Sequence, residues 1–274
     1  FGPILHIMAY KRDDLESHIN CLMAKGYGLT AAVQSRNETF IKAVKEKLRV
    51  GNLYVNRNQV GAVVGSQPFG GEGLSGTGPK AGGPRYLSAF QPVEQNIHIE
   101  PLSWRSQQKL DMKDRIASAL RNQMHEMGTE LVRQENCTGP TGELNQLSEY
   151  PRGLWLALGD AAGPLVQEAI EMGNRVVWLS DLDLEKSINP RLNHINIDGF
   201  AYDWLVDLPF NGLLVSTTEE CLKEIAQKLA EREGPLLPIV TQTGYSSQLV
   251  LERHISVDTT ASGGNPGLLM SAVQ

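Results

Sequence analysis

The sequence predicts an α/β protein with two units of alternating strands and helices, and two observations carry this prediction. Short apolar, β-prone runs alternate with amphipathic helical stretches over residues 4–56 and again over residues 154–257. The segments between them are as short as the connections of α/β folds normally are. Glycine-rich residues 61–83 and polar residues 91–150 separate the two patterns, so the units are expected to join near residues 91–110.

The first unit opens with an apolar run at residues 4–10, which predicts a strand. Residues 12–25 are expected to be helical, because Leu15, Ile19 and Leu22 recur at helical spacing and acidic residues occupy the first turn. Gly26 then ends this helix. The other elements expected in this unit are strands at 29–34 and 51–56 and a helix at 38–48.

Residues 61–83 cannot form a regular element. Beyond Gly61 they hold eight further glycines and two prolines, and each Gly inside a regular element costs roughly 0.5–1 kcal/mol. This composition would also suit a flexible linker. Val63, Val64, Phe69 and Leu74 interrupt it with apolar side chains, however, so we expect an ordered loop whose backbone N–H groups approach another group closely.

The second unit follows a polar stretch in which one helix is expected, at residues 112–131. Its alternating pattern predicts strands at 154–158, 175–179, 212–216, 236–240 and 249–257 and helices at 164–172 and 219–232. The last of these strands would pair at its edge with a neighbouring chain or with the first unit.

Composition narrows the classes of protein. The 274-residue chain is 41% hydrophobic and 20% charged, as soluble globular proteins are, and no stretch approaches the roughly 20 apolar residues that cross a bilayer. Its net charge of −6 argues against a nucleic-acid partner. Three scattered cysteines fit a reducing cytoplasm, and the six histidines have no metal-ligand spacing, so no metal site is expected.

Several segments of the first ninety residues resemble the C-terminal part of the aldehyde dehydrogenase catalytic domain. Phe1-Gly2-Pro3 resembles the end of that family's Glu-x-Phe-Gly-Pro motif. Residues 51–56 resemble the segment that leads to the active-site floor, and residues 67–78 resemble the loop that closes the substrate pocket. Residues 56–65 and 78–84 are similar to the L-glutamate γ-semialdehyde dehydrogenase branch. A chain that opens within a motif, without an initiator Met, is expected to be a fragment.

The second half extends the resemblance to a bifunctional family. Residues 139–145 and 256–265 resemble the C-terminal extension of the proline utilization A family, which fuses a flavin-dependent proline dehydrogenase to this aldehyde dehydrogenase. The resemblance implies three parts: the end of the catalytic domain at 1–98, a Rossmann-like and non-catalytic domain at 99–250, and a strand with a tunnel-covering tail at 251–274.

The resemblance also implies a reaction, in which L-glutamate γ-semialdehyde is oxidised to L-glutamate with NAD through a thioester on a Cys. None of the three cysteines has the family's Gly-Gln-x-Cys context, and Cys21 lies on the apolar side of its predicted helix, where we expect it to be buried. The nucleophile, the general base and most of the dinucleotide site are therefore expected upstream of residue 1. This chain contributes no catalytic residue by that reasoning and is expected to be inactive alone.

Four residues carry the expected binding roles. Gly61 and Ala62 match positions that hold the substrate's α-carboxylate with backbone N–H groups, since two adjacent amides with small side chains form an anion-binding concavity; an ordinary hairpin turn is the alternative. Phe69 matches the aromatic residue that packs on the aliphatic part of the aldehyde, and a core Phe is the alternative. Phe1 matches the residue that contacts the nicotinamide.

The family implies further partners: FAD in the full-length parent, contacts with its upstream catalytic and flavin domains, a homo-oligomer, and a cytoplasmic parent that associates with the inner membrane during turnover. A competing hypothesis treats residues 100–274 as an independent assembly or ligand-binding module. Residues 159–163 follow a predicted strand and precede a helix, but they do not form the Gly-x-Gly-x-x-Gly fingerprint, so nucleotide binding is not expected there.

Overall fold

The computed structural model describes residues 3–91, 99, 101–102, 110–125, 130–183, 189–197 and 199–260. The elements up to residue 91 are η1 (Arg12–Asp14), α1 (Leu15–Met23), β1 (Tyr27–Gly28), β2 (Thr30–Val33), α2 (Glu38–Lys47), β3 (Asn52–Val55), β4 (Glu72–Gly73) and η2 (Leu87–Phe90). The elements that follow are α3 (Leu110–His125), β5 (Arg133–Cys137), β6 (Glu143–Pro151), β7 (Leu154–Leu158), η3 (Asp160–Ala162), α4 (Gly163–Glu171), β8 (Arg175–Ser180), β9 (Leu192–Asn196), η4 (Tyr202–Val206), β10 (Gly212–Val215), α5 (Glu219–Ala230), β11 (Ile239–Val240), α6 (Ser246–Leu249) and β12 (Val250–Asp258).

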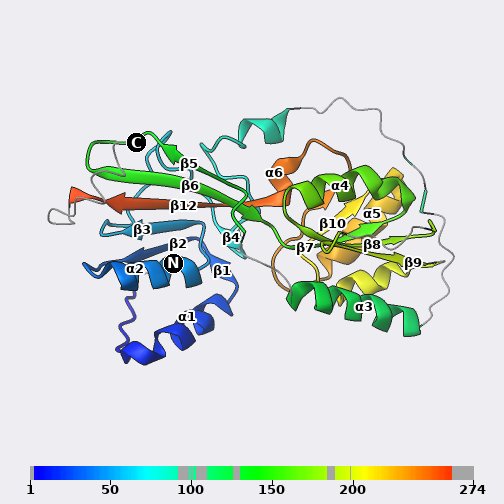
Figure 1. Ribbon diagram of the computed structural model, residues 1–274, viewed down its shortest axis with the longest axis horizontal. Coiled ribbons are helices and arrows are strands. Elements are labelled where there is room, and N and C mark those ends of the chain that lie inside the picture. The colour runs from blue at the N-terminus through cyan, green and yellow to red at the C-terminus, as the bar shows by residue number, and fades with distance from the viewer. Residues whose placement is uncertain are drawn as a thin grey trace.

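These elements form two five-stranded sheets that lie side by side (Figure 1). The parallel sheet has the order β11-β10-β7-β8-β9, which is a doubly wound arrangement. The mixed sheet has the order β2-β3-β12-β6-β5, with β2, β3 and β12 parallel and β6 and β5 antiparallel to their neighbours. The predicted mixed α/β class is therefore confirmed.

The strands of the parallel sheet are inserted between two neighbouring strands of the mixed sheet, whereas α3, which covers one face of the parallel sheet, precedes β5. Strand β6 ends at Pro151 and β7 begins at Leu154, while α6 leads directly into β12. At the junction Val250 pairs with Pro151, and the Arg152 Nε donates to the Gln248 carbonyl at 2.6 Å. The Arg152 Nη2 also donates to the Thr77 carbonyl at 2.9 Å, which ties the junction to the glycine-rich segment.

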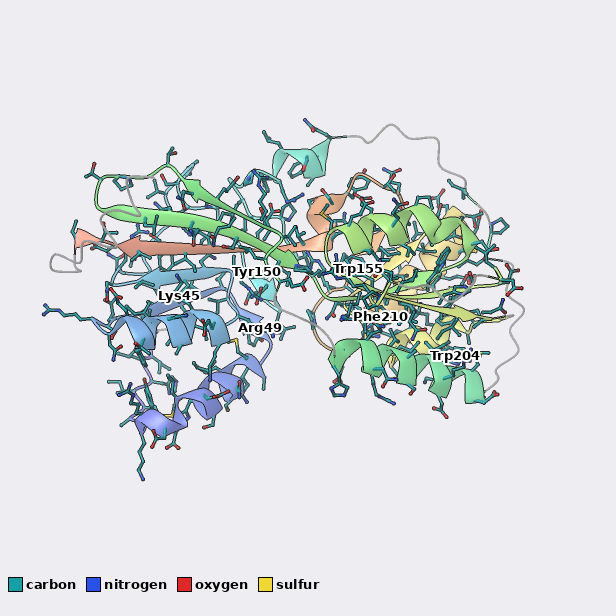
Figure 2. The ribbon with its side chains drawn as sticks, viewed as in Figure 1. Lys45, Arg49, Tyr150, Trp155, Trp204 and Phe210 are labelled. Atoms are coloured by element: carbon teal, nitrogen blue, oxygen red, sulfur yellow. The ribbon has the colours of Figure 1, made fainter. Side chains whose placement is uncertain are left out.

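Both faces of the parallel sheet are covered, with α3 and α4 on opposite sides (Figure 1). The core is mainly aliphatic and includes the buried aromatic side chains Trp155, Trp204 and Phe210 (Figure 2). Because β7, β8 and β10 are buried on both faces, they read as nearly continuous apolar runs. Among the described residues no helix is long and apolar enough to cross a membrane.

Most predicted elements are confirmed within a few residues, among them the helix expected at 112–131, which is α3. One expectation is wrong: residues 4–10 form no strand, because they have no neighbouring strand among the described residues to accept their backbone hydrogen bonds. Two other parts of the fold were not expected. The polar residues 133–151 form the hairpin of β5 and β6 in the mixed sheet, and residues 192–196 form strand β9 of the parallel sheet. The boundaries of the three expected domains stay a prediction.

The strand expected at 249–257 is β12, and the structure identifies its partners. It pairs in parallel with β3 and in antiparallel with β6, so it lies at the centre of the mixed sheet. Of the two partners left open by the sequence, the first unit is the one observed.

Candidate functional site

The predicted anion-binding residues lie in a loop that is fixed at both ends. We call residues 57–67 the anchor loop. On its first side the Asn58 Oδ1 accepts from the Val60 N–H at 3.0 Å, and on its second side the Gln67 Oε1 accepts from the Val63 N–H at 3.0 Å. The Gln67 N–H donates in turn to the Val63 carbonyl at 2.9 Å. The segment is therefore an ordered loop, as expected.

Gly61 and Ala62 lie between these two fixed amides and are exposed. Within the described part of the chain, the N–H groups of Gly61 and Ala62 have no acceptor, while the amides of Val60 and Val63 on either side are both bonded. Gly61 has a φ of 74°, and no atom lies within 4 Å of the position a Cβ would take. Two adjacent unpaired amides with open space beside them can bind an anion.

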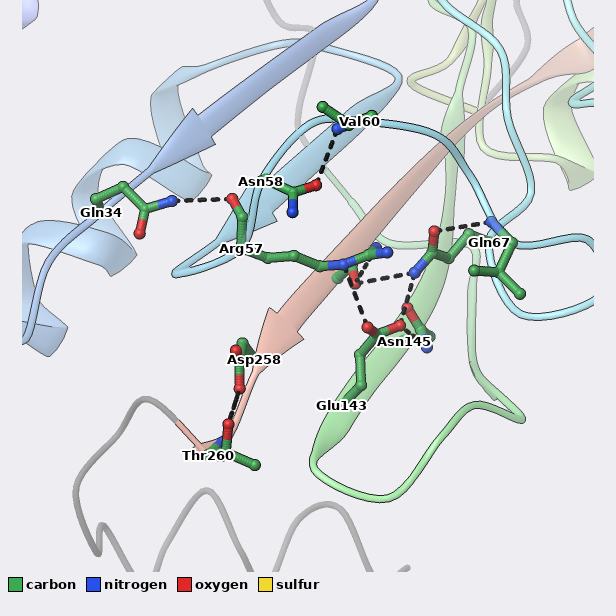
Figure 3. Close-up of polar contacts among 11 residues, drawn as sticks. Gln34, Arg57, Asn58, Val60, Gln67, Glu143, Asn145, Asp258 and Thr260 are labelled. Carbon is green, nitrogen blue, oxygen red and sulfur yellow. Dashed lines mark hydrogen bonds and ion pairs between the residues drawn. The ribbon is translucent and has the colours of Figure 1, made fainter.

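A buried polar cluster holds the anchor loop against the mixed sheet (Figure 3). Its members are Arg57, Gln67, Glu143, Asn145 and Ser256. The Gln67 Nε2 donates to the Glu143 Oε1 at 2.6 Å and to the Ser256 Oγ at 3.4 Å. The Arg57 Nε lies 3.3 Å from the Glu143 Oε2, and the Arg57 Nη1 donates to the Ser256 Oγ at 3.2 Å.

The cluster joins segments that are far apart in the sequence. Arg57 and Gln67 belong to the anchor loop, whereas Glu143 and Asn145 lie at the start of β6 and Ser256 lies near the end of β12. Asn145 donates from its Nδ2 to the Glu143 Oε1 at 2.8 Å. Glu143 is thus the common acceptor of three side chains and the point at which they meet.

A second set of buried contacts fixes residues 68–83. Lys80 is 2% exposed; its N–H donates to the Glu252 Oε2 at 2.7 Å and its Nζ to the Asn52 Oδ1 at 3.2 Å. Burial lowers the pKa of Lys80 to about 8, partly offset by the charge of Glu252, whose own pKa burial raises. Gly51 permits this packing, because a Cβ there would lie 1.9 Å from the Gly70 carbonyl oxygen.

Two bidentate ion pairs fix the edges of the same region. The Arg253 Nε and Nη2 donate to the two carboxylate oxygens of Glu72, each at 3.0 Å. The Arg85 Nε and Nη2 donate to the Glu149 carboxylate, each at 2.7 Å. Such paired bonds set geometry as well as charge balance, so the glycine-rich segment is held to β6 and β12 along its length.

The structure adds less about the other predicted residues, which are Phe69, Phe1, the C-terminal tail and Cys21. Phe69 is half-buried and its backbone pairs with Ala81, with N···O distances of 3.0 and 2.9 Å. Phe1 lies outside the described residues, as do residues 261–274 of the predicted tail. Cys21 is exposed, which corrects the expectation that it is buried. Ile19 is the buried residue of α1, and a position two residues further along a helix lies on nearly the opposite face.

The parallel sheet does not leave its ligand-binding position open. In doubly wound sheets, ligands bind outside the carboxyl ends of the strands where the strand order reverses, which here is between β7 and β10. Gly159 follows β7 at this point, and the Leu102 Cδ2 lies 2.6 Å from the position a Gly159 Cβ would take. Leu102 therefore covers the backbone that a phosphate would have to approach.

Sequence reasoning did not assign Arg57, Gln67, Glu143 or Ser256 to the site. The sequence did contain a signal for three of the cluster residues. Glu143 and Asn145 lie in the 139–145 motif, and Ser256 lies in the 256–265 motif. Nothing in the sequence assigns those motifs a role in substrate binding, and only the structure places them beside the anchor loop.

Comparison with known proteins begins with a family match. Residues 1–95 match the model of the aldehyde dehydrogenase family.

Bifunctional relatives match almost the whole chain. Over 98% of its length it is 34% identical to bifunctional protein PutA of Rhizobium meliloti and 35% identical to that of Salmonella typhimurium. The chain spans about a quarter of these relatives, 24% and 23% of their lengths. The solved structure of Proline Utilization A from Corynebacterium freiburgense shares the fold, with a TM-score of 0.54 at 23% identity over 94% of this chain and 25% of that chain.

A shorter match points to one branch of the family. Over 88 residues, or 32% of this chain and 17% of the relative, the chain is 47% identical to 1-pyrroline-5-carboxylate dehydrogenase 1 of Halalkalibacterium halodurans. The resemblance to the proline utilization A proteins that the sequence motifs predicted is therefore confirmed.

Proposed function

We propose that this chain is the C-terminal part of an L-glutamate γ-semialdehyde dehydrogenase within a bifunctional, NAD-dependent enzyme of proline catabolism. The observation that carries the proposal is the pair of adjacent, unpaired and exposed amides at Gly61 and Ala62, fixed on both sides by hydrogen bonds. The names of the PutA and 1-pyrroline-5-carboxylate dehydrogenase relatives support it.

The proposed role of the anchor loop is recognition of the substrate's α-carboxylate. The Gly61 and Ala62 N–H groups donate to the carboxylate oxygens, and the small side chains at both positions let the anion approach the backbone. Hydrogen bonds to a charged group contribute about 1.5–3 kcal/mol each, enough to select this substrate over an aldehyde without a carboxylate. Phe69 would pack on the aliphatic carbons between the carboxylate and the aldehyde.

NAD, the hydride acceptor of this reaction, does not fit the described residues. Leu102 covers the switch point of the parallel sheet, and the one predicted nicotinamide contact, Phe1, lies outside the described part of the chain. We therefore propose that the dinucleotide site and the nucleophilic Cys belong to other parts of the polypeptide. The second unit is then non-catalytic.

The wider context is proposed from the family alone. The full-length protein would carry FAD in a proline dehydrogenase domain, form a homo-oligomer and reside in the cytoplasm, with association at the inner membrane during turnover. Residues 261–274 would cover an internal tunnel. The alternative of an independent module at residues 100–274 is not supported, because β12 and β6 complete the sheet that contains β3.

The test is substrate preference of the full-length protein. NADH formation is followed with L-glutamate γ-semialdehyde and with pentanal, which has the same chain length but no carboxylate or amine. We expect kcat/KM to be at least about tenfold higher for the semialdehyde, since one lost hydrogen bond to a charged group has about that effect. Equal values, or no oxidation of the semialdehyde, would contradict the proposal.

A further inference from the structure

We propose that Glu143 is a positioning residue for substrate recognition: acting through Gln67, it sets the conformation in which the anchor loop presents the Gly61 and Ala62 amides. This inference rests on the proposed function of those two amides. It assigns to strands β6 and β12 a part in substrate selection, although neither contributes an atom to the proposed carboxylate site.

The hydrogen bonds of Gln67 fix the orientation of its side-chain amide. Its side chain bonds at both ends, with Oε1 accepting from the Val63 N–H and Nε2 donating to Glu143. An ionised carboxylate can only accept hydrogen bonds, so Glu143 requires the amide nitrogen to face it. The amide oxygen must then face Val63, which is the orientation that fixes the second side of the loop.

The Glu143 carboxylate is itself held in place by two neighbouring side chains. Its Oε1 accepts from Asn145 at 2.8 Å, and its Oε2 lies 3.3 Å from the Arg57 Nε. The side chains of Arg57 and Glu143 are 17% and 13% exposed. The Glu143 carboxylate is held by Asn145 at one oxygen and by the Arg57 cation at the other, so it has little freedom to move. The Gln67 side chain is only 3% exposed and has little freedom either.

The polar cluster is connected to the two free amides through the ends of the anchor loop. Arg57 begins the anchor loop and Gln67 ends it, and both bond to Glu143 and to Ser256. Glu143 therefore brings together the two ends of the loop. Since Val63 follows Ala62 directly, releasing the Val63 N–H from Gln67 would allow the neighbouring amides to turn away from a shared anion.

The variant that tests this is Glu143→Gln in the full-length enzyme. A Gln at 143 can donate to residue 67, so the Gln67 amide is no longer forced into one orientation. We expect the ratio of kcat/KM for L-glutamate γ-semialdehyde to kcat/KM for pentanal to fall about tenfold, through a higher KM for the semialdehyde. Glu135→Gln on β5, which removes an ion pair to Arg133, is the matched control and should leave the ratio unchanged.

An exchange of the two side chains distinguishes positioning from loss of stability. In the double variant Gln67→Glu with Glu143→Gln, residue 143 donates to residue 67, and residue 67 still accepts from the Val63 N–H. We expect the exchange to restore the ratio to within about threefold of the unsubstituted enzyme. If Glu143→Gln does not fold, Gln67→Met, which removes both bonds with little change in volume, is measured in its place.

The outcomes separate this inference from the proposed function. If the unsubstituted enzyme does not oxidise the semialdehyde, the proposed function fails. If it does, an unchanged ratio in Glu143→Gln, an equal loss for both aldehydes, or no restoration in the exchanged double variant would each overturn the role of Glu143.

Discussion

Alternate residues of β12 form a buried polar row beneath the glycine-rich segment. Glu252 accepts from the Lys80 N–H, Ser256 accepts from Arg57, and His254 lies between them at 1% exposure. Such groups are expensive to bury unless they are bonded. The Glu252 Oε2 and the Ser256 Oγ have hydrogen-bond partners, whereas neither ring nitrogen of His254 has a hydrogen-bond partner among the described residues.

His254 predicts a dependence of stability on pH. Burial, with a contribution from the charge of Lys80, lowers the pKa of His254 to about 4. The unfolded chain takes up this proton near pH 6.5 and the folded chain only near pH 4, so stability falls as the pH falls through that window. The 2.5-unit difference corresponds to about 3 kcal/mol of unfolding free energy.

The measurement is urea unfolding of the chain and of its His254→Gln variant between pH 7 and about pH 4. We expect the variant to lose about 3 kcal/mol less over this range. His6→Gln, at an exposed position, is the control and should follow the unsubstituted chain. Parallel curves for the unsubstituted chain and His254→Gln would contradict the assignment.

Among the strands, β12 is the central strand of the mixed sheet. Its backbone bonds to β3 on one side and to β6 on the other, so its residues have a partner strand in both directions. Its second face lines a groove of about 680 Å³ beside α2, where Lys45, Arg49 and Tyr150 also lie (Figure 2).

A proline in this strand should therefore be costly. Ile255 pairs with Leu53 and with Gln146, and a Pro at 255 would remove a ladder hydrogen bond in a central strand. We expect Ile255→Pro to destabilise the fold by about 3 kcal/mol or more and Ile255→Val by about 1 kcal/mol, as measured by thermal unfolding. Similar melting temperatures for the two variants would show that β12 is not central.

The elements that sequence could predict are those with an intrinsic pattern. The apolar strands β7, β8 and β10 and the amphipathic helices α2 and α5 were predicted because burial determines their composition. The polar strand β5, Arg-Gln-Glu-Asn-Cys, has no such pattern and forms because β6 lies beside it. The apolar run at 4–10 has the composition of a strand but no strand next to it among the described residues.

The candidate site divides in the same way. Gly61, Ala62 and Phe69 could be predicted from the sequence because they occur within two short neighbouring motifs, residues 56–65 and 67–78, that resemble a known family. Glu143 and Ser256 could not be assigned from the sequence, since they lie 76 and 189 residues from Gln67 and meet it only through the pairing of β6 with β12.

At the scale of the whole molecule, the chain passes through the mixed sheet before and after the parallel unit. The parallel unit leaves from β6 and returns into β12, which are neighbours. The C-terminal half thereby supplies the support for a loop that belongs to the first ninety residues. The two halves of the chain form one structural unit around the proposed carboxylate site.

If the Gly61 and Ala62 amides bind the substrate carboxylate, two glycine variants of the full-length enzyme should differ in activity but not in stability. Gly61 and Gly82 have φ values of 74° and 70°, and both have open space where a Cβ would lie. Ala should therefore introduce a similar backbone strain of roughly 1 kcal/mol at either position.

The measurement is kcat/KM for L-glutamate γ-semialdehyde in Gly61→Ala and in Gly82→Ala. We expect a loss of about tenfold or more in Gly61→Ala and of less than about twofold in Gly82→Ala, with similar melting temperatures. Equal losses in the two variants would contradict the claim that the anchor loop binds the carboxylate.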